Sequence, residues 1–266
     1  MQDFMLSGAW FWGIPNWVQF VLIGVIGYLV GCFSGARFIS RLKKRDITKI
    51  GSGNPGATNM IREFGFLLGA LTFLIDAFKA GIPAVIVYHL YNQGAYAVAD
   101  AAGGLAVSGA VFEGTQIPVG LFAALLCGGC AVLGHIYPIT ARFKGGKGIS
   151  SGVGLFWLML GLANPWYLLI GLAAIAALPF AITLTKLGSL CNLSYLAGFG
   201  VWQIAMLYTV YGAGSVWITL SAVLTLFVVA ISWVAHHKNI RCLLSGEERP
   251  TIIIKLKKKQ KKFKNN

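Results

Sequence analysis

Residues 215–235 read SVWITLSAVLTLFVVAISWVA and contain no charged side chain. A helix of about 20 apolar residues crosses the hydrocarbon core of a bilayer, which is about 30 Å thick. Other predominantly apolar stretches lie at residues 17–40, 66–91, 118–139, 150–164, 166–186 and 190–210. The sequence therefore predicts an all-α, polytopic integral membrane protein with about seven transmembrane helices.

The composition of the whole chain agrees with this class. Hydrophobic residues make up 57% of the 266 residues and charged residues only 11%, and the mean hydropathy is +0.73. These values exclude an ordinary soluble globular domain. The small residues around Cys127 and Cys130 lie inside an apolar run, so they favour close helix packing over a redox-active cysteine pair.

The basic residues predict how the chain is oriented in the membrane. Lys and Arg cluster at residues 37–62, 142–147 and 238–264, and the segments 1–16, 92–117, 164–165 and 211–215 contain none. Cytoplasmic loops carry the excess of Lys and Arg. We therefore expect the N-terminus outside, the C-terminus in the cytoplasm, and residues 92–117 as an external loop. This distribution also argues against a nucleic-acid partner, despite the net charge of +14.

The C-terminal end differs in composition from the rest. We expect residues 1–249 to form the membrane domain and residues 250–266 a basic cytoplasmic tail. The run from Lys255 to Lys264 suits contact with anionic membrane lipids. The alternative is a solvated tail that only fixes the topology.

A loop of small and polar residues separates two of the predicted helices. It reads GSGNPGATN over residues 51–59. Glycines allow backbone amides to approach a ligand closely, and such amides, with neighbouring hydroxyl and amide side chains, hold phosphate oxygens. The loop therefore predicts an anion site at the membrane surface.

Two further polar clusters fall on the same predicted side of the membrane. Lys144-Gly145-Gly146-Lys147-Gly148 leads into a predicted helix, whose positive N-terminal end favours an anion. A third cluster holds His236, Asn239 and Glu248. Taken alone, the glycine-rich segment is equally typical of a flexible cytoplasmic turn. Three such clusters together favour a site for a phosphorylated ligand.

Ionisable residues also occur inside predicted membrane helices. Asp76 and Lys79 lie three residues apart on one helical face, either as a neutralising pair or as part of the site. His135 ends a predicted helix as a ligand or as a structural histidine. The sequence shows no zinc-ligand spacing. We therefore expect no metal and no cofactor.

The motifs resemble those of the bacterial membrane glycerol-3-phosphate acyltransferases that use acyl-phosphate, the PlsY family. The first motif is the loop at 51–59 with Arg62, Gly65 and Asp76-x-x-Lys79. The second is Gly134-His135-Ile136-Tyr137-Pro138 followed by residues 144–148, and the third is His236-x-x-Asn239-Ile240 followed by Leu243-Leu244, Gly246 and Glu248. The resemblance extends over about residues 25–249.

The resemblance implies an enzyme of the bacterial cytoplasmic (inner) membrane whose active site faces the cytoplasm. It would transfer a fatty acyl group from acyl-phosphate to the sn-1 hydroxyl of glycerol 3-phosphate, giving lysophosphatidic acid and phosphate in the first step of phospholipid synthesis. The catalytic residues it implies are His236, Asn239, Lys147, Ser52 and Cys32. The substrate-binding residues it implies are Gly51, Ser52, Gly53, Asn54, Gly56, Thr58, Asn59, Arg62, His135, Lys144, Gly145, Gly146, Lys147, Gly148 and Glu248.

Within this resemblance, Lys147 and the amides of Gly145–Gly148 would bind a substrate phosphate. Glu248 would fix the third motif through a basic partner. Two positions depart from the family pattern: Cys32 replaces a serine, and Thr48 replaces an arginine after Asp46-Ile47. Ser34 would lie around the helix from Cys32 and would not substitute for that serine.

Two other functions remain open at this point. A diverged homologue would bind a phosphate-bearing ligand without turnover, and the replacements at Cys32 and Thr48 favour it. A transporter of a phosphorylated solute would use Asp76, Lys79 and Arg37. The gathering of polar residues on one face argues against a transport path.

Overall fold

The computed structural model describes residues 16–101, 116–248 and 250–251, and within these ranges the chain forms helices and no strands. The helices are α1 (Asn16–Gly31), α2 (Gly35–Leu42), α3 (Ala57–Phe64), α4 (Phe66–Ala101), α5 (Gln116–Ile136), α6 (Ile149–Ala163), α7 (Trp166–Thr185), α8 (Gly188–Tyr211), α9 (Val216–Ala235) and α10 (His237–Leu244). A 3₁₀ turn, η3 (Ile139–Ala141), follows α5. The all-α prediction is confirmed.

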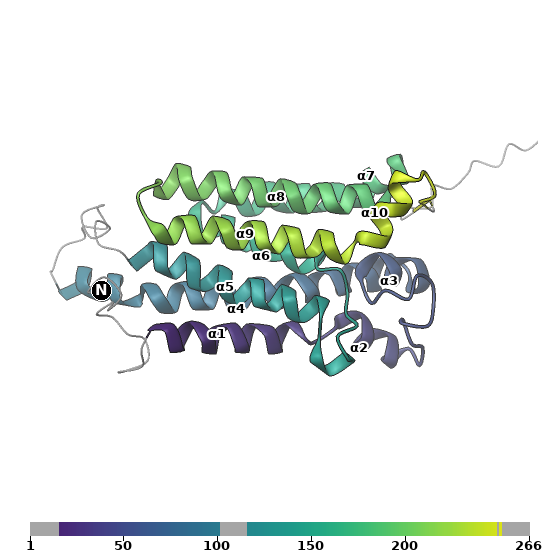
Figure 1. Ribbon diagram of the computed structural model, residues 1–266, viewed down its shortest axis with the longest axis horizontal. Coiled ribbons are helices and arrows are strands. Elements are labelled where there is room, and N and C mark those ends of the chain that lie inside the picture. The colour runs from purple at the N-terminus through teal and green to yellow at the C-terminus, as the bar shows by residue number, and fades with distance from the viewer. Residues whose placement is uncertain (1–15, 102–115, 249, 252–266) are drawn as a thin grey trace, which may run out of the picture.

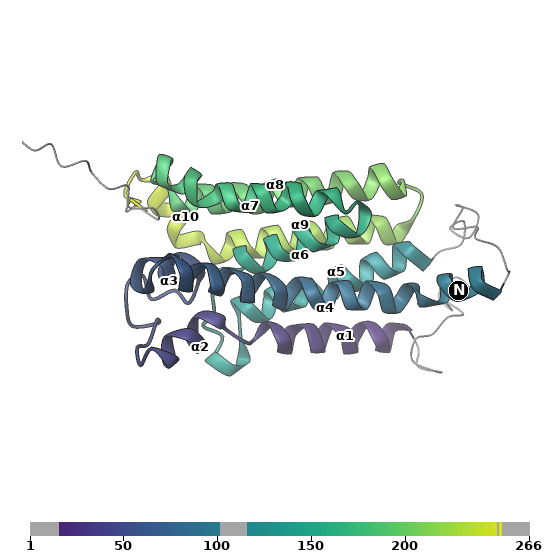
Figure 2. The ribbon, with the colours of Figure 1, turned by 180° about the vertical axis from the view of Figure 1, so that it is seen from behind.

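The long helices lie side by side in one elongated bundle (Figures 1 and 2). The short helices α2, α3 and α10 cap one end, and α1 starts from the opposite end. Among the described residues six segments are long and apolar enough to cross a bilayer: Trp17–Leu42, Phe66–Asn92, Pro118–Ala141, Trp166–Thr185, Gly188–Tyr211 and Val216–Ala235. The remaining predicted span is α6, which has 15 residues and is therefore only about 22 Å long.

The first predicted span, 17–40, is not a continuous helix. It breaks after Gly31, and α2 begins at Gly35. Two carbonyls in the break receive side-chain donors: Lys79 Nζ lies 2.6 Å from Phe33 O, and Thr140 Oγ1 lies 3.4 Å from Cys32 O. Ser34 caps α2, accepting a hydrogen bond from Arg37 N at 3.4 Å. The expectation that Ser34 lies on the same helix as Cys32 is therefore wrong.

The expected external loop at residues 92–117 is also partly helical. Helix α4 continues to Ala101, because residues 92–101 contain four alanines, which favour helix, and no proline. Residues 102–115 lie outside the described residues.

Close approach of helices holds α1 against α5. A Cβ on Gly27 would lie 2.2 Å from Cys127 O, and one on Gly134 would lie 2.1 Å from Tyr28 O. The predicted role of small residues near Cys127 is thus confirmed. The interior centres on α6, whose Leu155, Phe156 and Leu160 are fully buried. Large apolar side chains remain exposed on the outer faces of α1, α7 and α9, as expected for helices that contact lipid: Val25, Leu29, Leu169, Ile170, Leu226 and Phe227.

Candidate active site

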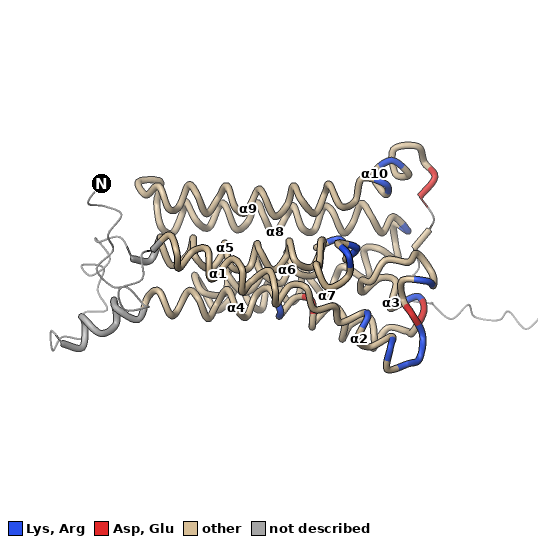
Figure 3. Tube along the Cα trace, turned by 60° about the horizontal axis from the view of Figure 1, so that its bottom comes forward, with Lys and Arg blue, Asp and Glu red and all other residues tan. Residues whose placement is uncertain are grey.

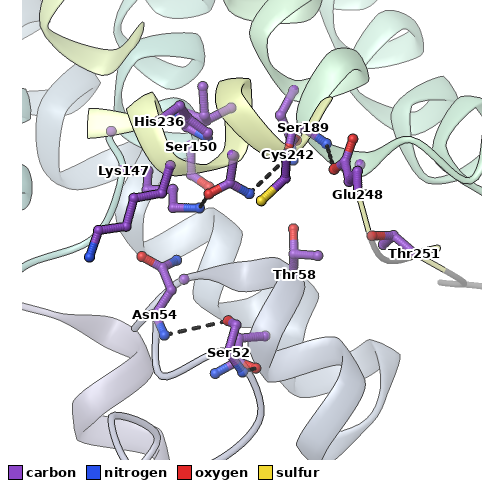
Figure 4. A pocket seen from close by; sticks show the side chains of 18 of the residues that line it. Ser52, Asn54, Thr58, Lys147, Ser150, Ser189, His236, Cys242, Glu248 and Thr251 are labelled. Atoms are coloured by element: carbon purple, nitrogen blue, oxygen red, sulfur yellow. Dashed lines mark hydrogen bonds between the residues drawn. The ribbon is translucent and has the colours of Figure 1, made fainter. Parts of the chain in front are cut away.

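A polar hollow of about 320 Å³ lies at the end of the bundle that carries the short helices (Figure 4). Helices α3, α6, α8 and α10 all begin at its wall. The first N–H groups of a helix have no partner within that helix, and the helix dipole adds positive potential there. The residues that these four helix starts contribute are Gly56, Thr58, Asn59, Gly148, Ile149, Ser150, Gly188, Ser189, His236, Lys238 and Asn239. Such an arrangement binds an anion.

The loop at residues 51–59 forms one wall, and Ser52, Asn54 and Thr58 face His236 and Ser189 across the hollow (Figure 4). The buried side chain of Asn59 shapes this loop. Its Oδ1 accepts from Ser52 N at 3.0 Å, and its Nδ2 donates to Ile50 O at 3.1 Å. Gly51 has a φ of +58°, and a Cβ there would lie 2.2 Å from Asn59 Oδ1. Asn59 therefore acts as a scaffold of the wall.

The resemblance implied that the amides of Gly145–Gly148 bind a phosphate, but two of these amides are used within the protein. Gly145 N donates to Ile136 O at 3.1 Å, and Gly146 N donates to His135 O at 3.0 Å. These two amides close the turn at the end of α5 and are not directed at a ligand. Gly148 does line the hollow, with a φ of +83° as the N-cap of α6.

Lys147 supplies the positive charge of this segment. Its Nζ donates to Asn239 Oδ1. Burial lowers the pKa of Lys147, the carboxylate of Glu248 raises it and the charge of Arg62 lowers it, with a net pKa of about 8. At neutral pH the side chain is a cation whose charge water screens weakly, which strengthens its attraction for a phosphate.

His236 is buried at the start of α10, and its tautomer follows from its partner. The carbonyl of Ser232 lies 2.8 Å from Nδ1, and because a carbonyl oxygen only accepts, Nδ1 carries the proton. Burial, opposed by the hydrogen bond to Ser232 and assisted by the charge of Lys147, lowers the pKa of His236 to about 4. The imidazole is therefore neutral at pH 7, with Nε2 available to accept a hydrogen bond from a hydroxyl.

A chain of hydrogen bonds joins the third motif to α8. Asn239 Nδ2 donates to Ser189 Oγ at 2.8 Å, and Ser189 N donates to Glu248 Oε1 at 2.8 Å. Glu248 thus fixes its segment through the positive start of a helix rather than through the basic partner that the resemblance suggested. Ser189 was not identified from the sequence. The signal that could have found it is a Gly-Ser pair at the cytoplasmic start of a predicted membrane helix.

Arg62 meets a residue from the far end of the chain. It donates to Thr251 Oγ1, and Thr251 N donates to Lys186 O at 2.9 Å. Thr251 is buried and lines the hollow. It falls in the segment 250–266, which was expected to be a basic cytoplasmic tail, and residues 252–266 lie outside the described residues.

The sequence model for glycerol-3-phosphate acyltransferases matches residues 21–246. The chain belongs to this family.

Curated relatives are similar along nearly their whole length. A glycerol-3-phosphate acyltransferase of Thermosipho melanesiensis is 31% identical over 237 residues, which cover 89% of this chain and 95% of the relative. One of Sinorhizobium medicae is 32% identical over 241 residues, covering 90% and 95%.

A solved structure shares the fold. The crystal structure of PlsY, described as an integral membrane glycerol 3-phosphate acyltransferase in its glycerol 3-phosphate form, superposes with a TM-score of 0.60 at 25% identity. The match covers 87% of this chain and 95% of that one. This protein is accordingly a multi-pass membrane protein.

Not every residue that the acyltransferase resemblance implied lies in the hollow. Lys144, Gly145 and Gly53 line a second hollow beside it. Cys32 lies on a third, at the break between α1 and α2. Gly51 and Gly146 line none of the three hollows. The residues that do line the first hollow are Ser52, Asn54, Gly56, Thr58, Asn59, Arg62, His135, Lys147, Gly148, His236, Asn239 and Glu248.

Thr48, the other departure from the acyltransferase pattern, is tied to Asp46. Asp46 Oδ1 accepts from Thr48 N at 3.0 Å and from Thr48 Oγ1 at 2.7 Å. These two hydrogen bonds lower the pKa of Asp46. Thr48 therefore closes the turn before the 51–59 loop and lines the second hollow.

The ion pair expected within α4 is confirmed. Lys79 Nζ lies 3.0 Å from Asp76 Oδ1, and Asp76 and His135 both line the first hollow. In the described part of the chain, no group of three or more His, Cys, Asp or Glu side chains is arranged to hold a metal ion.

Proposed function

We propose that this family member transfers a fatty acyl group from acyl-phosphate to the sn-1 hydroxyl of glycerol 3-phosphate, forming lysophosphatidic acid and inorganic phosphate. The observation that carries this proposal is the polar hollow, where four helix N-termini meet Lys147 and Arg62 at the end of a membrane bundle. A compact phosphate ester fits such a site, because it offers several acceptor oxygens and a double negative charge.

A second hollow suits the phosphate of the donor. It measures about 880 Å³ and is lined by Arg37, Arg41, Arg142 and Lys144. It shares Ser52 and Asn54 with the first hollow. Two phosphate-bearing substrates would thus meet at the 51–59 loop, with the acyl carbonyl beside Ser52 and Asn54.

The fatty tail of the donor requires an apolar path from that point. A third hollow of about 380 Å³ shares Arg37, Arg41 and Thr140 with the second, and adds Leu29, Phe33 and Phe38. The side chains of Phe33 and Phe38 are half exposed on the outer surface. This supports a tail that lies along the end of α1 and continues into the lipid.

The chemistry needs no protein nucleophile. The acceptor hydroxyl oxygen attacks the acyl carbonyl carbon, the bond from that carbon to the phosphate oxygen breaks, and the hydroxyl proton leaves with the phosphate. A phosphate, whose second pKa is about 6, is a stronger base than His236, whose pKa is about 4. His236 Nε2 therefore aligns the hydroxyl by accepting its hydrogen bond, and the phosphate finally takes the proton.

The direct test is turnover by the purified protein. Palmitoyl-phosphate and glycerol 3-phosphate would be added to protein in detergent or lipid, and release of phosphate and formation of lysophosphatidic acid would be measured. A relative from the family serves as the positive control. Absence of turnover beside an active control would refute the catalytic proposal.

The assignment of the hollows has its own test. Lys147→Ala is expected to raise the KM for glycerol 3-phosphate by about tenfold or more with little change in the donor KM, as for loss of one charge-assisted contact. The double variant Arg41→Gln, Arg142→Gln should raise the KM for acyl-phosphate and leave the KM for glycerol 3-phosphate nearly unchanged. Lys43→Gln, an exposed lysine outside all three hollows, is the control. Equal effects of both variants on both KM values would contradict the assignment.

A non-catalytic phosphate binder is the second candidate, because Cys32 and Thr48 stand where the family has serine and arginine. If the wild-type protein binds glycerol 3-phosphate without turnover, the double variant Cys32→Ser, Thr48→Arg tests the reason. Gained activity would assign the loss to these two positions. A variant that remains inactive would place the defect elsewhere.

We propose a location in the bacterial cytoplasmic membrane, with the hollows facing the cytoplasm and the basic residues 255–264 near anionic lipids. Lys and Arg gather at the end of the bundle that carries α2, α3 and α10 (Figure 3), which supports this orientation. Cys242 is exposed at the hollow, whereas the other cysteines are buried or half-buried. A membrane-impermeant maleimide should label Cys242 in inverted vesicles and not in intact spheroplasts; the reverse pattern would reverse the orientation.

A further inference from the structure

The ammonium of Lys79 holds three segments of the chain together. It lies 2.6 Å from Phe33 O in the α1–α2 break, 2.8 Å from His135 Nδ1 at the end of α5, and 3.0 Å from Asp76 Oδ1 on its own helix. Lys79 is 8% exposed and Asp76 is fully buried. An ammonium has three N–H donors and no acceptor. Lys79 hydrogen-bonds Phe33 O and His135 Nδ1, and Asp76 Oδ1 is its ion-pair partner.

This arrangement determines the tautomer of His135. Asp76 Oδ1 lies 3.5 Å from Nδ1, whereas Lys79 Nζ is closer, at 2.8 Å. Because Lys79 only donates, Nδ1 accepts from it, and the imidazole proton resides on Nε2. Nε2 lies directly against Gly146, where an added Cβ would be 2.1 Å away. The carbonyl of the same histidine accepts from Gly146 N at 3.0 Å. Ring and backbone of His135 therefore fix the residue that precedes Lys147.

Phe33, whose carbonyl also contacts Lys79, connects to the same 144–147 segment through helix α2. Phe33 precedes α2, and from α2 Arg37 donates to Lys144 O. The segment 144–147 is thus held at Lys144 by the element after the break and at Gly146 by His135. Lys79 joins both supports, although it does not itself line the first hollow.

We propose that Lys79 is a positioning residue for Lys147: by fixing His135 as its Nε2–H tautomer and by holding the α1–α2 break, it sets where the 144–147 segment presents Lys147 to the hollow. This inference deepens the proposed function. Its kinetic test rests on that function, whereas its structural test does not. A displacement of about 1 Å at a reacting group costs up to about a hundredfold in rate, so a buried support far from the substrate has a measurable effect.

Two substitutions of His135 separate this role from direct substrate contact. In His135→Asn the carboxamide oxygen replaces Nδ1 and accepts from Lys79, whereas in His135→Gln the carboxamide occupies the position of Nε2 and leaves Lys79 without that partner. We expect His135→Gln to raise the KM for glycerol 3-phosphate by about ten- to a hundredfold, and His135→Asn to raise it far less. A histidine that contacts substrate through Nε2 would give the opposite order, which would overturn the proposal.

Exposed His89 on the same helix as Lys79 provides matched controls. His89→Asn and His89→Gln should leave both KM values unchanged, and thermal unfolding in detergent would confirm that all four variants are folded. Equal impairment of the two folded His135 variants would also overturn the proposal.

A spectroscopic measurement tests the tautomer without any activity assay. ¹⁵N NMR of histidine-labelled wild-type protein should show His135 protonated on Nε2 and unprotonated on Nδ1 at neutral pH. The double variant Asp76→Asn, Lys79→Gln, which leaves no unpaired charge, should lose this single tautomer. An Nδ1–H tautomer in the wild-type protein would refute the inference while leaving the proposed acyl transfer untouched.

Discussion

At the scale of single residues, the charge of Lys147 depends on its surroundings. Its pKa of about 8 reflects burial and the charge of Arg62, which lower it, and the carboxylate of Glu248, which raises it. The motif around Lys147 was predicted from the sequence. Its pKa was not, because Arg62 and Glu248 reach it from distant segments.

This pKa predicts how substrate binding depends on pH. Lys147 is protonated below about pH 8 and neutral above it, and a phosphate dianion forms above about pH 6. The KM for glycerol 3-phosphate should be lowest between these values and rise by about tenfold per pH unit well above pH 8. Initial rates from pH 5.5 to 9.5 would measure it. A KM that stays constant up to pH 9.5 would show that Lys147 does not bind the phosphate.

Substitution of Glu248 should lower the pKa of Lys147. Glu248→Gln keeps an oxygen to accept from Ser189 N but removes the negative charge that raises the pKa of Lys147. The rise in KM should therefore begin at a lower pH than in the wild-type protein. Glu248→Ala also removes the acceptor, which costs about 1–3 kcal/mol of stability for a buried donor. If Glu248→Gln lowers the melting temperature as much as Glu248→Ala does, the hydrogen bond that Ser189 N donates does not account for the loss of stability.

At the scale of helices, the sequence predicted the long elements well because their apolar runs match the thickness of a bilayer. Five of the seven predicted spans lie within about three residues of the observed helices at each end. The break after Gly31 was missed because Lys79 and Thr140, from other helices, satisfy its carbonyls. The sequence did not predict α3 and α10, or α2 as a helix separate from the first span, because eight-residue segments give a weak periodic signal.

The contact between α1 and α5 gives a prediction at this scale. Gly27→Ala places a Cβ against the backbone at Cys127 O, and the forced separation of the helices should cost about 1–3 kcal/mol. Thermal unfolding in a fixed detergent would measure the loss. Gly198→Ala in α8 is the control, because a Cβ there meets no atom within 4 Å. If both variants melt alike, close packing at Gly27 does not stabilise the bundle.

At the scale of the whole molecule, the bundle places apolar side chains on its sides and charge at one end. The three polar motifs are far apart in sequence, yet their predicted position on one side of the membrane is enough to predict that they converge. Ser189 and Thr251 could not be assigned in this way. Their roles arise from contacts with Glu248 and Arg62 that depend on how the helices pack.

The convergence of four helix starts on one hollow also bears on how the reaction ends. Their amides and dipoles attract a compact dianion whether or not it carries a glycerol group. Orthophosphate, released at every turnover, should therefore compete with glycerol 3-phosphate for the vacated hollow. Steady-state rates at several phosphate concentrations should show competitive product inhibition against glycerol 3-phosphate, weakened in Lys147→Ala. Purely uncompetitive kinetics would speak against a shared site. In a cell, the rate of acylation would then fall as free phosphate accumulates, without any separate regulatory site.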